Sequence, residues 1–251
     1  MKTSLKEKLR NQQVTIGSWI TIGHSAIAEI MAGAGFDWLS VDMEHSSVSL
    51  HQVEELIRTI DLCGVVPLVR VSENNRIVIR RVMDAGAHGV IVPMVNSRIE
   101  AEAAVGAVKY PPAGSRGVGL ARAQQYGFGF AEYTKWLLNE SVVIVQIEHI
   151  KAIENLEAIL STPGVDGSMV GPYDLSASMG WPGEFDRPEV QQALQRYEDA
   201  CRQMKKPIGF HVVQPDARTA VAYRNKGYTF LAVGVDFLYL GGKCREVIGD
   251  I

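Results

Sequence analysis

The feature that most constrains the fold is a regular alternation of apolar, strand-like runs with amphipathic, helix-like segments. Continuous runs rich in β-branched residues are typical of strands buried on both faces, as in a parallel sheet. Helical spacing between the runs indicates crossover helices. The predicted strands are Val14–Ile20, Phe36–Asp42, Val65–Arg70, Gly89–Pro93, Val142–Glu148, Val165–Val170, Pro207–Val212 and Thr229–Gly234. The clearest predicted helices are Leu50–Cys63, Arg76–Ala85, Ile99–Lys109, Ile153–Leu160, Glu189–Met204 and Asp216–Lys226.

Eight strand–helix units in 251 residues predict a (β/α)₈ barrel of the TIM type, an α/β fold that forms one domain over residues 1–251. The main competing architecture is an open, doubly wound sheet. No Gly-x-Gly-x-x-Gly follows the first predicted strand, which weakens that alternative.

One segment breaks the regular spacing. About thirty residues, at roughly 110–140, separate the fourth crossover helix from the fifth strand. The segment begins with prolines and glycines and then carries the aromatic residues Tyr126, Phe128, Phe130 and Tyr133. Long insertions in compact domains are usually disordered or functional. Because this one is aromatic, we expect it to pack, either as a lid or against another subunit.

Composition excludes several classes of partner. The formal net charge is −3 and the chain has no block rich in Lys or Arg, so we expect no nucleic-acid partner. The longest apolar runs, such as Gly89–Val95, are far shorter than the roughly 20 residues that span a bilayer, so we expect no membrane association. The segment Met1–Gln13 has no secretory character, and the three cysteines form no C-x-x-C pair. A cytoplasmic location is therefore expected.

In a barrel of this kind the active site lies at the carboxyl ends of the strands. Glu148 ends the fifth predicted strand and Asp174 follows the sixth. Two carboxylates without a nearby pair of histidines suit a hard divalent ion such as Mg²⁺ or Mn²⁺ better than zinc. The open alternative is that Asp174 only caps a short helix.

The second and third strands end in further polar residues. His45 is a candidate general base because imidazole titrates near neutral pH, and Asp42 is placed to orient it. Arg70 is a candidate for binding a carboxylate or a developing oxyanion. The alternatives are a loop histidine bonded to backbone and a structural ion pair of Arg70 with Asp42 or Glu44.

Two more side chains near strand ends are candidate substrate contacts. Gln146 shares the barrel-facing side of its strand with Glu148, and Trp19 lies near the end of the first strand. Either residue could instead pack or bond only within the barrel. No lysine falls at the carboxyl end of a predicted strand, which disfavours Schiff-base chemistry.

Taken together, these segments resemble the HpcH/HpaI family of class II, metal-dependent aldolases that act on 2-keto-3-deoxy acids. The resemblance covers nearly the whole chain. The motifs that carry it are Gly17-Ser18-Trp19, Asp42-Met43-Glu44-His45, Pro67-Leu68-Val69-Arg70, Pro111-Pro112-Ala113-Gly114-Ser115-Arg116-Gly117, Val145-Gln146-Ile147-Glu148 and Val170-Gly171-Pro172-Tyr173-Asp174-Leu175-Ser176. Their order and spacing together are far more specific than any single motif.

The resemblance implies a role for each of these residues. Glu148 and Asp174 would bind Mg²⁺ or Mn²⁺, with Co²⁺ as a further option. Arg70 would contact the keto oxygen with help from Gln146, and His45 with Asp42 would form the acid/base pair. The segment Gly171, Pro172 and Tyr173 would receive the substrate carboxylate through backbone amides.

The resemblance also implies an assembly. Related proteins form homohexamers built as trimers of dimers, with the C-terminal helix exchanged between subunits. The loop that contains Arg116 and Val118 would then reach the substrate site of a neighbouring subunit.

The implied function is reversible retro-aldol cleavage of a 4-hydroxy-2-keto acid to pyruvate and an aldehyde. The nearest alternative is another carbon–carbon lyase reaction through the pyruvate enolate, such as oxaloacetate decarboxylation. A sugar-phosphate isomerase or epimerase is more distant, because the loops after strands seven and eight are acidic and do not suit phosphate. A non-enzymatic binding or assembly module is the remaining alternative.

Overall fold

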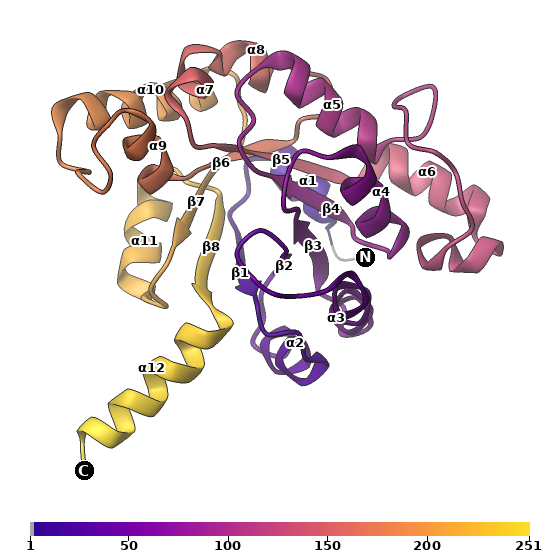
Figure 1. Cartoon of the computed structure of the whole chain (residues 1–251), viewed down its shortest axis with the longest axis horizontal. Helices are drawn as coiled ribbons and strands as arrows, with labels where there is room; N and C mark the ends of the chain where they lie inside the picture. The colour runs from indigo at the N-terminus through magenta and orange to yellow at the C-terminus, as the bar shows by residue number, and fades with distance from the viewer. Residues whose placement is uncertain (1–2) are drawn as a thin grey trace.

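The computed structural model describes residues 3–251, and its eight parallel strands close into a barrel in chain order (Figure 1). Each strand pairs in parallel with the next, and β8 returns to β1. The strands are β1 Thr15–Ile20, β2 Trp38–Asp42, β3 Val66–Arg70, β4 Gly89–Val92, β5 Val142–Ile147, β6 Gly167–Val170, β7 Ile208–Val212 and β8 Phe230–Val235. The predicted (β/α)₈ architecture is confirmed, and the predicted strand limits differ by at most two residues.

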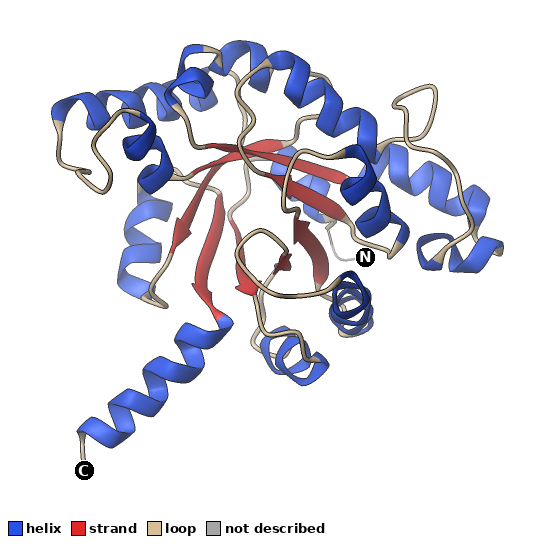
Figure 2. Ribbon diagram, viewed as in Figure 1, coloured by secondary structure: helices blue, strands red, loops and turns tan. Residues whose placement is uncertain are grey.

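Helices surround the strands, as Figure 2 shows. They are α1 Leu5–Arg10, α2 Ser25–Ala32, α3 Leu50–Leu62, α4 Arg76–Asp84, α5 Arg98–Val108, α6 Phe130–Glu140, α7 Ile150–Glu154, α8 Leu156–Leu160, α9 Pro172–Ser178, α10 Pro188–Gln203, α11 Ala217–Asn225 and α12 Asp236–Gly249, with a short 3₁₀ segment, η1 Arg122–Gly127. Polar caps determine where several begin: Ser49 forms a capping box with Gln52, and Asn75 caps α4. The predicted single helix Ile153–Leu160 is two helices, because Asn155 leaves helical geometry between them.

Two apolar cores hold the barrel. The inner core fills the barrel, where the rings of Trp38 and Phe230 stack with centroids 4.4 Å apart and aliphatic side chains from β3, β4 and β5 complete the layers. The outer core lies between the strands and the helices. Because strand side chains alternate between the two sides, every strand except β7 contributes to both cores. The strands are therefore held firmly, and the polar residues at their carboxyl ends project from a rigid frame.

The insertion lies at the amino-terminal end of the barrel. In α6 the ring of Tyr133 stacks on Trp136, which in turn packs 4.9 Å from His88, the residue just before β4. This position does not fit the predicted lid, since the substrate site is expected at the opposite end. Phe128 is 94% exposed, so packing against another subunit stays a prediction.

The C-terminal helix behaves differently from the others. In Figure 1, α12 projects away from the barrel instead of lying along it. Its large apolar side chains Phe237, Leu240, Val247 and Ile248 are exposed. A helix of the (β/α)₈ fold normally buries one apolar face, so the structure leaves this face without the cover that such helices usually have.

Across residues 3–251, no helix is both long enough and apolar enough to cross a membrane.

Candidate active site

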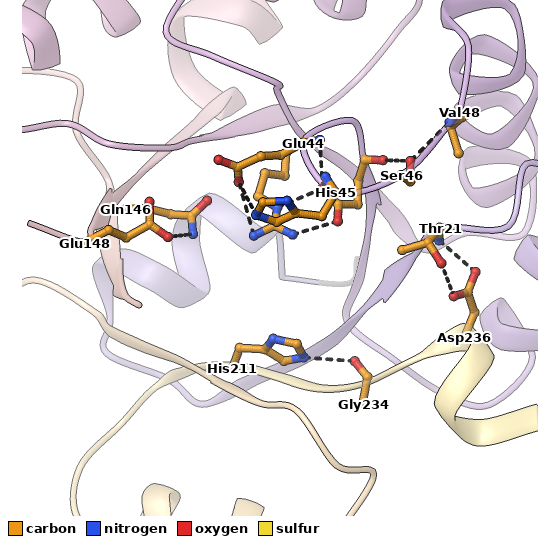
Figure 3. Close-up of polar contacts among 12 residues, drawn as sticks. Thr21, Glu44, His45, Ser46, Val48, Gln146, Glu148, His211, Gly234 and Asp236 are labelled. Atoms are coloured by element: carbon orange, nitrogen blue, oxygen red, sulfur yellow. Dashed lines mark hydrogen bonds and ion pairs between the residues drawn. The ribbon is translucent and has the colours of Figure 1, made fainter. Parts of the chain in front are cut away.

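A bidentate ion pair between β2 and β3 forms the centre of the site. Asp42 and Arg70 are register partners at the ends of these adjacent strands. Arg70 donates from Nε to Oδ1 at 2.8 Å and from Nη2 to Oδ2 at 2.6 Å. Burial alone would raise the pKa of Asp42, but the Arg70 guanidinium outweighs it and lowers the pKa. Nη1 of Arg70 lies 3.3 Å from Glu44, so the guanidinium is fixed between two carboxylates (Figure 3).

Trp19 lies beneath this guanidinium. The central carbon of Arg70 is 4.4 Å from the ring centroid, within the range of a cation–π contact. Trp19 is only 2% exposed. The structure therefore assigns Trp19 to supporting Arg70 from below, and its burial argues against the predicted direct contact with substrate.

A second group of side chains comes from β5. Gln146 donates from Nε2 to Oε1 of Glu148 at 2.6 Å, and the backbone N–H of Met94 donates to Oε2 at 3.1 Å. Glu148 is 5% exposed. Burial, together with the nearby charges of Glu44 and Asp174, raises the pKa of Glu148 to about 7.

The start of α9 comes very close to Glu148. A Cβ placed on Gly171 would lie 2.7 Å from Oε1 of Glu148, so glycine is needed for this approach. The N–H of Gly171 donates to the carbonyl of Ile147, and Pro172 has no N–H. The predicted amide contacts therefore fall to Tyr173 and Asp174, in the first turn of α9.

His45 lies in the loop after β2, and its side chain is 70% exposed. Its backbone N–H donates to Oδ1 of Asp42 at 3.3 Å. Its imidazole instead faces Glu44, with Nε2 3.8 Å from Oε2. The predicted pairing of the His45 and Asp42 side chains is therefore replaced by a contact through the backbone, and Glu44 is the carboxylate beside the imidazole.

Arg116 and Val118 do not lie together with these residues. The Arg116 side chain is wholly buried and donates to Asp84 at 2.6 Å and to the hydroxyl of Tyr133 at 3.0 Å. The guanidinium is enclosed by this chain's own residues, which argues against the predicted contact of Arg116 with the substrate of a neighbouring subunit. Val118 is exposed, and its contact with a neighbouring subunit stays a prediction.

Two functional candidates, Glu44 and His211, were missed by the sequence reasoning. His211 occupies the last but one position of β7 and contacts the ring of Trp19. The same criterion that selected Arg70, a polar residue at a barrel-facing strand end, would have selected it. Glu44 was considered only as an ion-pair partner, although it adjoins both His45 and Arg70.

The carboxylates of the site do not by themselves form a complete metal cage. In the part of the chain that the structure describes, no group of three or more His, Cys, Asp or Glu side chains has the arrangement of a metal site. An ion there would need oxygen atoms from water or substrate as well, which is the usual situation for Mg²⁺.

The chain matches the HpcH/HpaI aldolase/citrate lyase family over residues 15–240. It is 38% identical to a hydroxypyruvate/pyruvate aldolase from Pseudomonas aeruginosa, over 97% of this chain and 91% of the relative. It is 40% identical to a 4-hydroxy-2-oxo-heptane-1,7-dioate aldolase from Salmonella typhimurium, over 94% of this chain and 89% of the relative.

A solved structure agrees with the sequence matches. The crystal structure of an HpcH/HpaI aldolase/citrate lyase family protein from Burkholderia cenocepacia has a TM-score of 0.92 to this chain at 33% identity, and 98% of each chain is covered. The predicted family and the predicted enzyme class are confirmed. This chain belongs to the HpcH/HpaI aldolase/citrate lyase family and is an aldolase, a carbon–carbon lyase.

Proposed function

We propose that this aldolase cleaves a 4-hydroxy-2-oxo acid to pyruvate and an aldehyde at the carboxyl ends of β2, β3, β5 and β6, with a divalent cation held by Glu148 and Asp174. The observation that carries the proposal is a fixed guanidinium, that of Arg70, near a buried carboxylate, that of Glu148, whose pKa is raised to about 7 and which forms no ion pair within residues 3–251. A 2-oxo acid offers a carboxylate and a keto oxygen, which would bind the guanidinium directly and Glu148 only through a shared cation.

The residues present fit a divalent cation. Each oxygen of Glu148 accepts one hydrogen bond, which leaves lone pairs free on both. Burial, and after it the neighbouring carboxylates, raise the pKa of Glu148, and a bound cation would stabilise its charged form. Mg²⁺ or Mn²⁺ suits these oxygen ligands, with Co²⁺ as a further option. When bound, the cation would act as a Lewis acid toward the oxygens of the oxo acid.

Arg70 stabilises the negative charge that develops on the keto oxygen as the C3–C4 bond breaks. Its guanidinium is held in advance by Asp42 and by the face of Trp19, so little reorganisation is needed during the reaction. An oxyanion donor of this kind contributes roughly 2.7–4 kcal/mol to the transition state.

His45 is the proposed acid/base group. It would take the proton of the C4 hydroxyl, the C3–C4 electron pair would become the enolate, and return of a proton to C3 would give pyruvate. The imidazole is exposed to solvent, and its Nε2 lies 3.8 Å from Oε2 of Glu44. Asp42 fixes the loop through the backbone of His45.

Exchange of the pyruvate methyl protons with deuterium tests the proposal, because it needs only enolate formation. Purified protein with Mn²⁺ should exchange these protons, whereas protein treated with EDTA, Glu148→Gln or Asp174→Asn should lose most of this activity. Glu157→Gln, on the outer helix α8, is the matched control and should exchange at the wild-type rate. Exchange that survives both EDTA and the two site variants would contradict the proposal.

We also propose that the chain forms a homohexamer of three dimers in which α12 is exchanged between subunits. The exposed apolar side chains of α12 and its projection from the barrel support this assembly (Figure 1). Light scattering on the full chain measures the assembly, and a monomer at micromolar concentration would contradict it.

The free state of Cys63, Cys201 and Cys244 supports a reducing, cytoplasmic location.

A further inference from the structure

His211 faces the mouth of the barrel from β7. Its neighbour Phe210 points outward and stacks on Tyr223 of α11, with centroids 3.8 Å apart. Because strand side chains alternate, His211 points inward, where its ring lies 5.6 Å from that of Trp19. In Figure 3 the imidazole lies on the β7 side of the site, and Gln146 and Glu148 lie on the β5 side.

The hydrogen bond of the imidazole determines which nitrogen carries the proton. Nε2 lies 3.2 Å from the carbonyl oxygen of Gly234, which can only accept. Nε2 is therefore the donor, and Nδ1 holds a lone pair in the neutral ring. No group among residues 3–251 donates to Nδ1, and in Figure 3 this atom lies on the side of the ring that faces Gln146 and Glu148.

The surroundings keep the ring neutral. Burial lowers the pKa of His211 to about 4; the hydrogen bond to Gly234 acts in the opposite direction, and the charge of Arg70 adds to the lowering. Asp42, the other charged group that acts on this ring, has the opposite effect to Arg70. At neutral pH Nδ1 of His211 is therefore an uncharged hydrogen-bond acceptor without a donor, in addition to Oε1 of Gln146 and Oε2 of Glu44, which are buried and also accept no hydrogen bond within residues 3–251.

We propose that Nδ1 of His211 accepts a hydrogen bond from a hydroxyl of the aldehyde half of the substrate, so that this aldolase favours hydroxyaldehydes over their deoxy analogues. The inference rests on the proposed function. Arg70 and Glu148 serve the oxo-acid half, and Figure 3 shows His211 on β7 apart from Glu148 on β5, which leaves His211 for the aldehyde. A neutral acceptor is matched by an O–H group, and a site with an unpaired acceptor discriminates against a ligand that lacks the donor.

The test compares glycolaldehyde with acetaldehyde, which differ by one hydroxyl, as acceptors for pyruvate in the presence of Mn²⁺. The measured quantity is the ratio of the two kcat/KM values. Intrinsic reactivity cancels when this ratio is compared between variants. In His211→Leu the ratio should fall about tenfold, equivalent to about 1.4 kcal/mol. His51→Leu, an exposed histidine of α3, is the matched control and should keep the wild-type ratio.

A structural role for His211, in which it only ties β7 to β8, would slow both aldehydes equally. An unchanged ratio in His211→Leu therefore overturns the inference. His211→Gln retains an acceptor oxygen and should keep the ratio within about threefold of wild type; a tenfold fall there also overturns it. Failure of the wild-type protein to exchange pyruvate methyl protons would instead overturn the proposed function.

Discussion

Two arginines, Arg70 and Arg116, make the same kinds of contact in different parts of the molecule. Each is bound to an aspartate at 2.6 Å, Arg70 to Asp42 and Arg116 to Asp84. Each also lies over an aromatic ring, Arg70 over Trp19 at 4.4 Å and Arg116 over Tyr110 at 4.7 Å. Neither the ion pair nor the cation–π contact distinguishes a catalytic arginine from a structural one.

Position and access make the difference. Arg70 ends a barrel strand, its side chain is 14% exposed, and it shares a site with Glu44 and Glu148. Arg116 lies in the insertion and is wholly buried, and its guanidinium bonds to Asp84, to the hydroxyl of Tyr133 and to the carbonyl of Val108. A substitution of Arg70 should therefore act mainly on turnover, and a substitution of Arg116 mainly on stability.

The largest expected effect is the loss of stability on substitution of Arg116. Arg116→Met should lower the free energy of unfolding by about 3–5 kcal/mol, because it leaves Asp84 without its partner and removes the bond to Tyr133. Urea unfolding measures the change, and turnover per folded molecule should remain within twofold of wild type. Normal stability with lost turnover would instead return Arg116 to the substrate site.

Arg70→Lys should have the opposite profile. Lysine keeps the charge beside Asp42 but loses the two-pronged contact that orients the group. We expect kcat to fall about 10²–10³-fold, in line with the loss of an oxyanion donor, while the free energy of unfolding changes by less than about 1.5 kcal/mol. A drop in stability that accounts for the loss of activity would remove the distinction between the two arginines.

Acid should lower the stability of the protein through His211, which lies near Arg70 in the site. The pKa of this buried imidazole is about 4, below the ordinary 6.5, so the unfolded chain binds a proton between these values that the folded chain does not. The free energy of unfolding should therefore decrease as pH falls from 6.5 to 4, by up to about 3 kcal/mol at 1.36 kcal/mol per unit. His211→Leu should lack this slope in urea unfolding at each pH, and an identical slope in both proteins would contradict the assignment.

The smallest expected effect tests the structural role of Arg116 through its partner Tyr133. Tyr133→Phe removes the hydroxyl that accepts from Arg116 and keeps the ring that packs on Trp136. We expect a loss of about 1 kcal/mol in the free energy of unfolding, with unchanged turnover. Thermal unfolding measures it, and a change in the aldehyde ratio would show that the insertion acts on the site.

Much of the fold was predictable because buried strands have a recognisable local sequence pattern. The eight strands are short and mostly apolar, and several end at or next to a polar residue such as Asp42 or Arg70, so their order and limits followed from the sequence. The insertion was less predictable: it depends on tertiary contacts such as Tyr133 with Trp136 and His88, which no local pattern encodes.

The parts of the site formed by side chains at strand ends were predictable. The contacts made by backbone groups in the loops were less so. The sequence predicted Arg70, Gln146 and Glu148 together. It could not show that Asp42 would contact His45 through an N–H, or that Gly171 would have its own N–H engaged, because these depend on loop conformation. His211 was missed although its position on β7 satisfied the criterion already in use.

The most direct test of the central claim is the anomalous scattering of a crystal soaked with Mn²⁺ and oxalate, an inert analogue of the pyruvate enolate. We expect one manganese peak bound by carboxylate oxygens of both Glu148 and Asp174, with oxalate in contact with the Arg70 guanidinium. Manganese elsewhere on the chain, or bound without either carboxylate, would contradict the account.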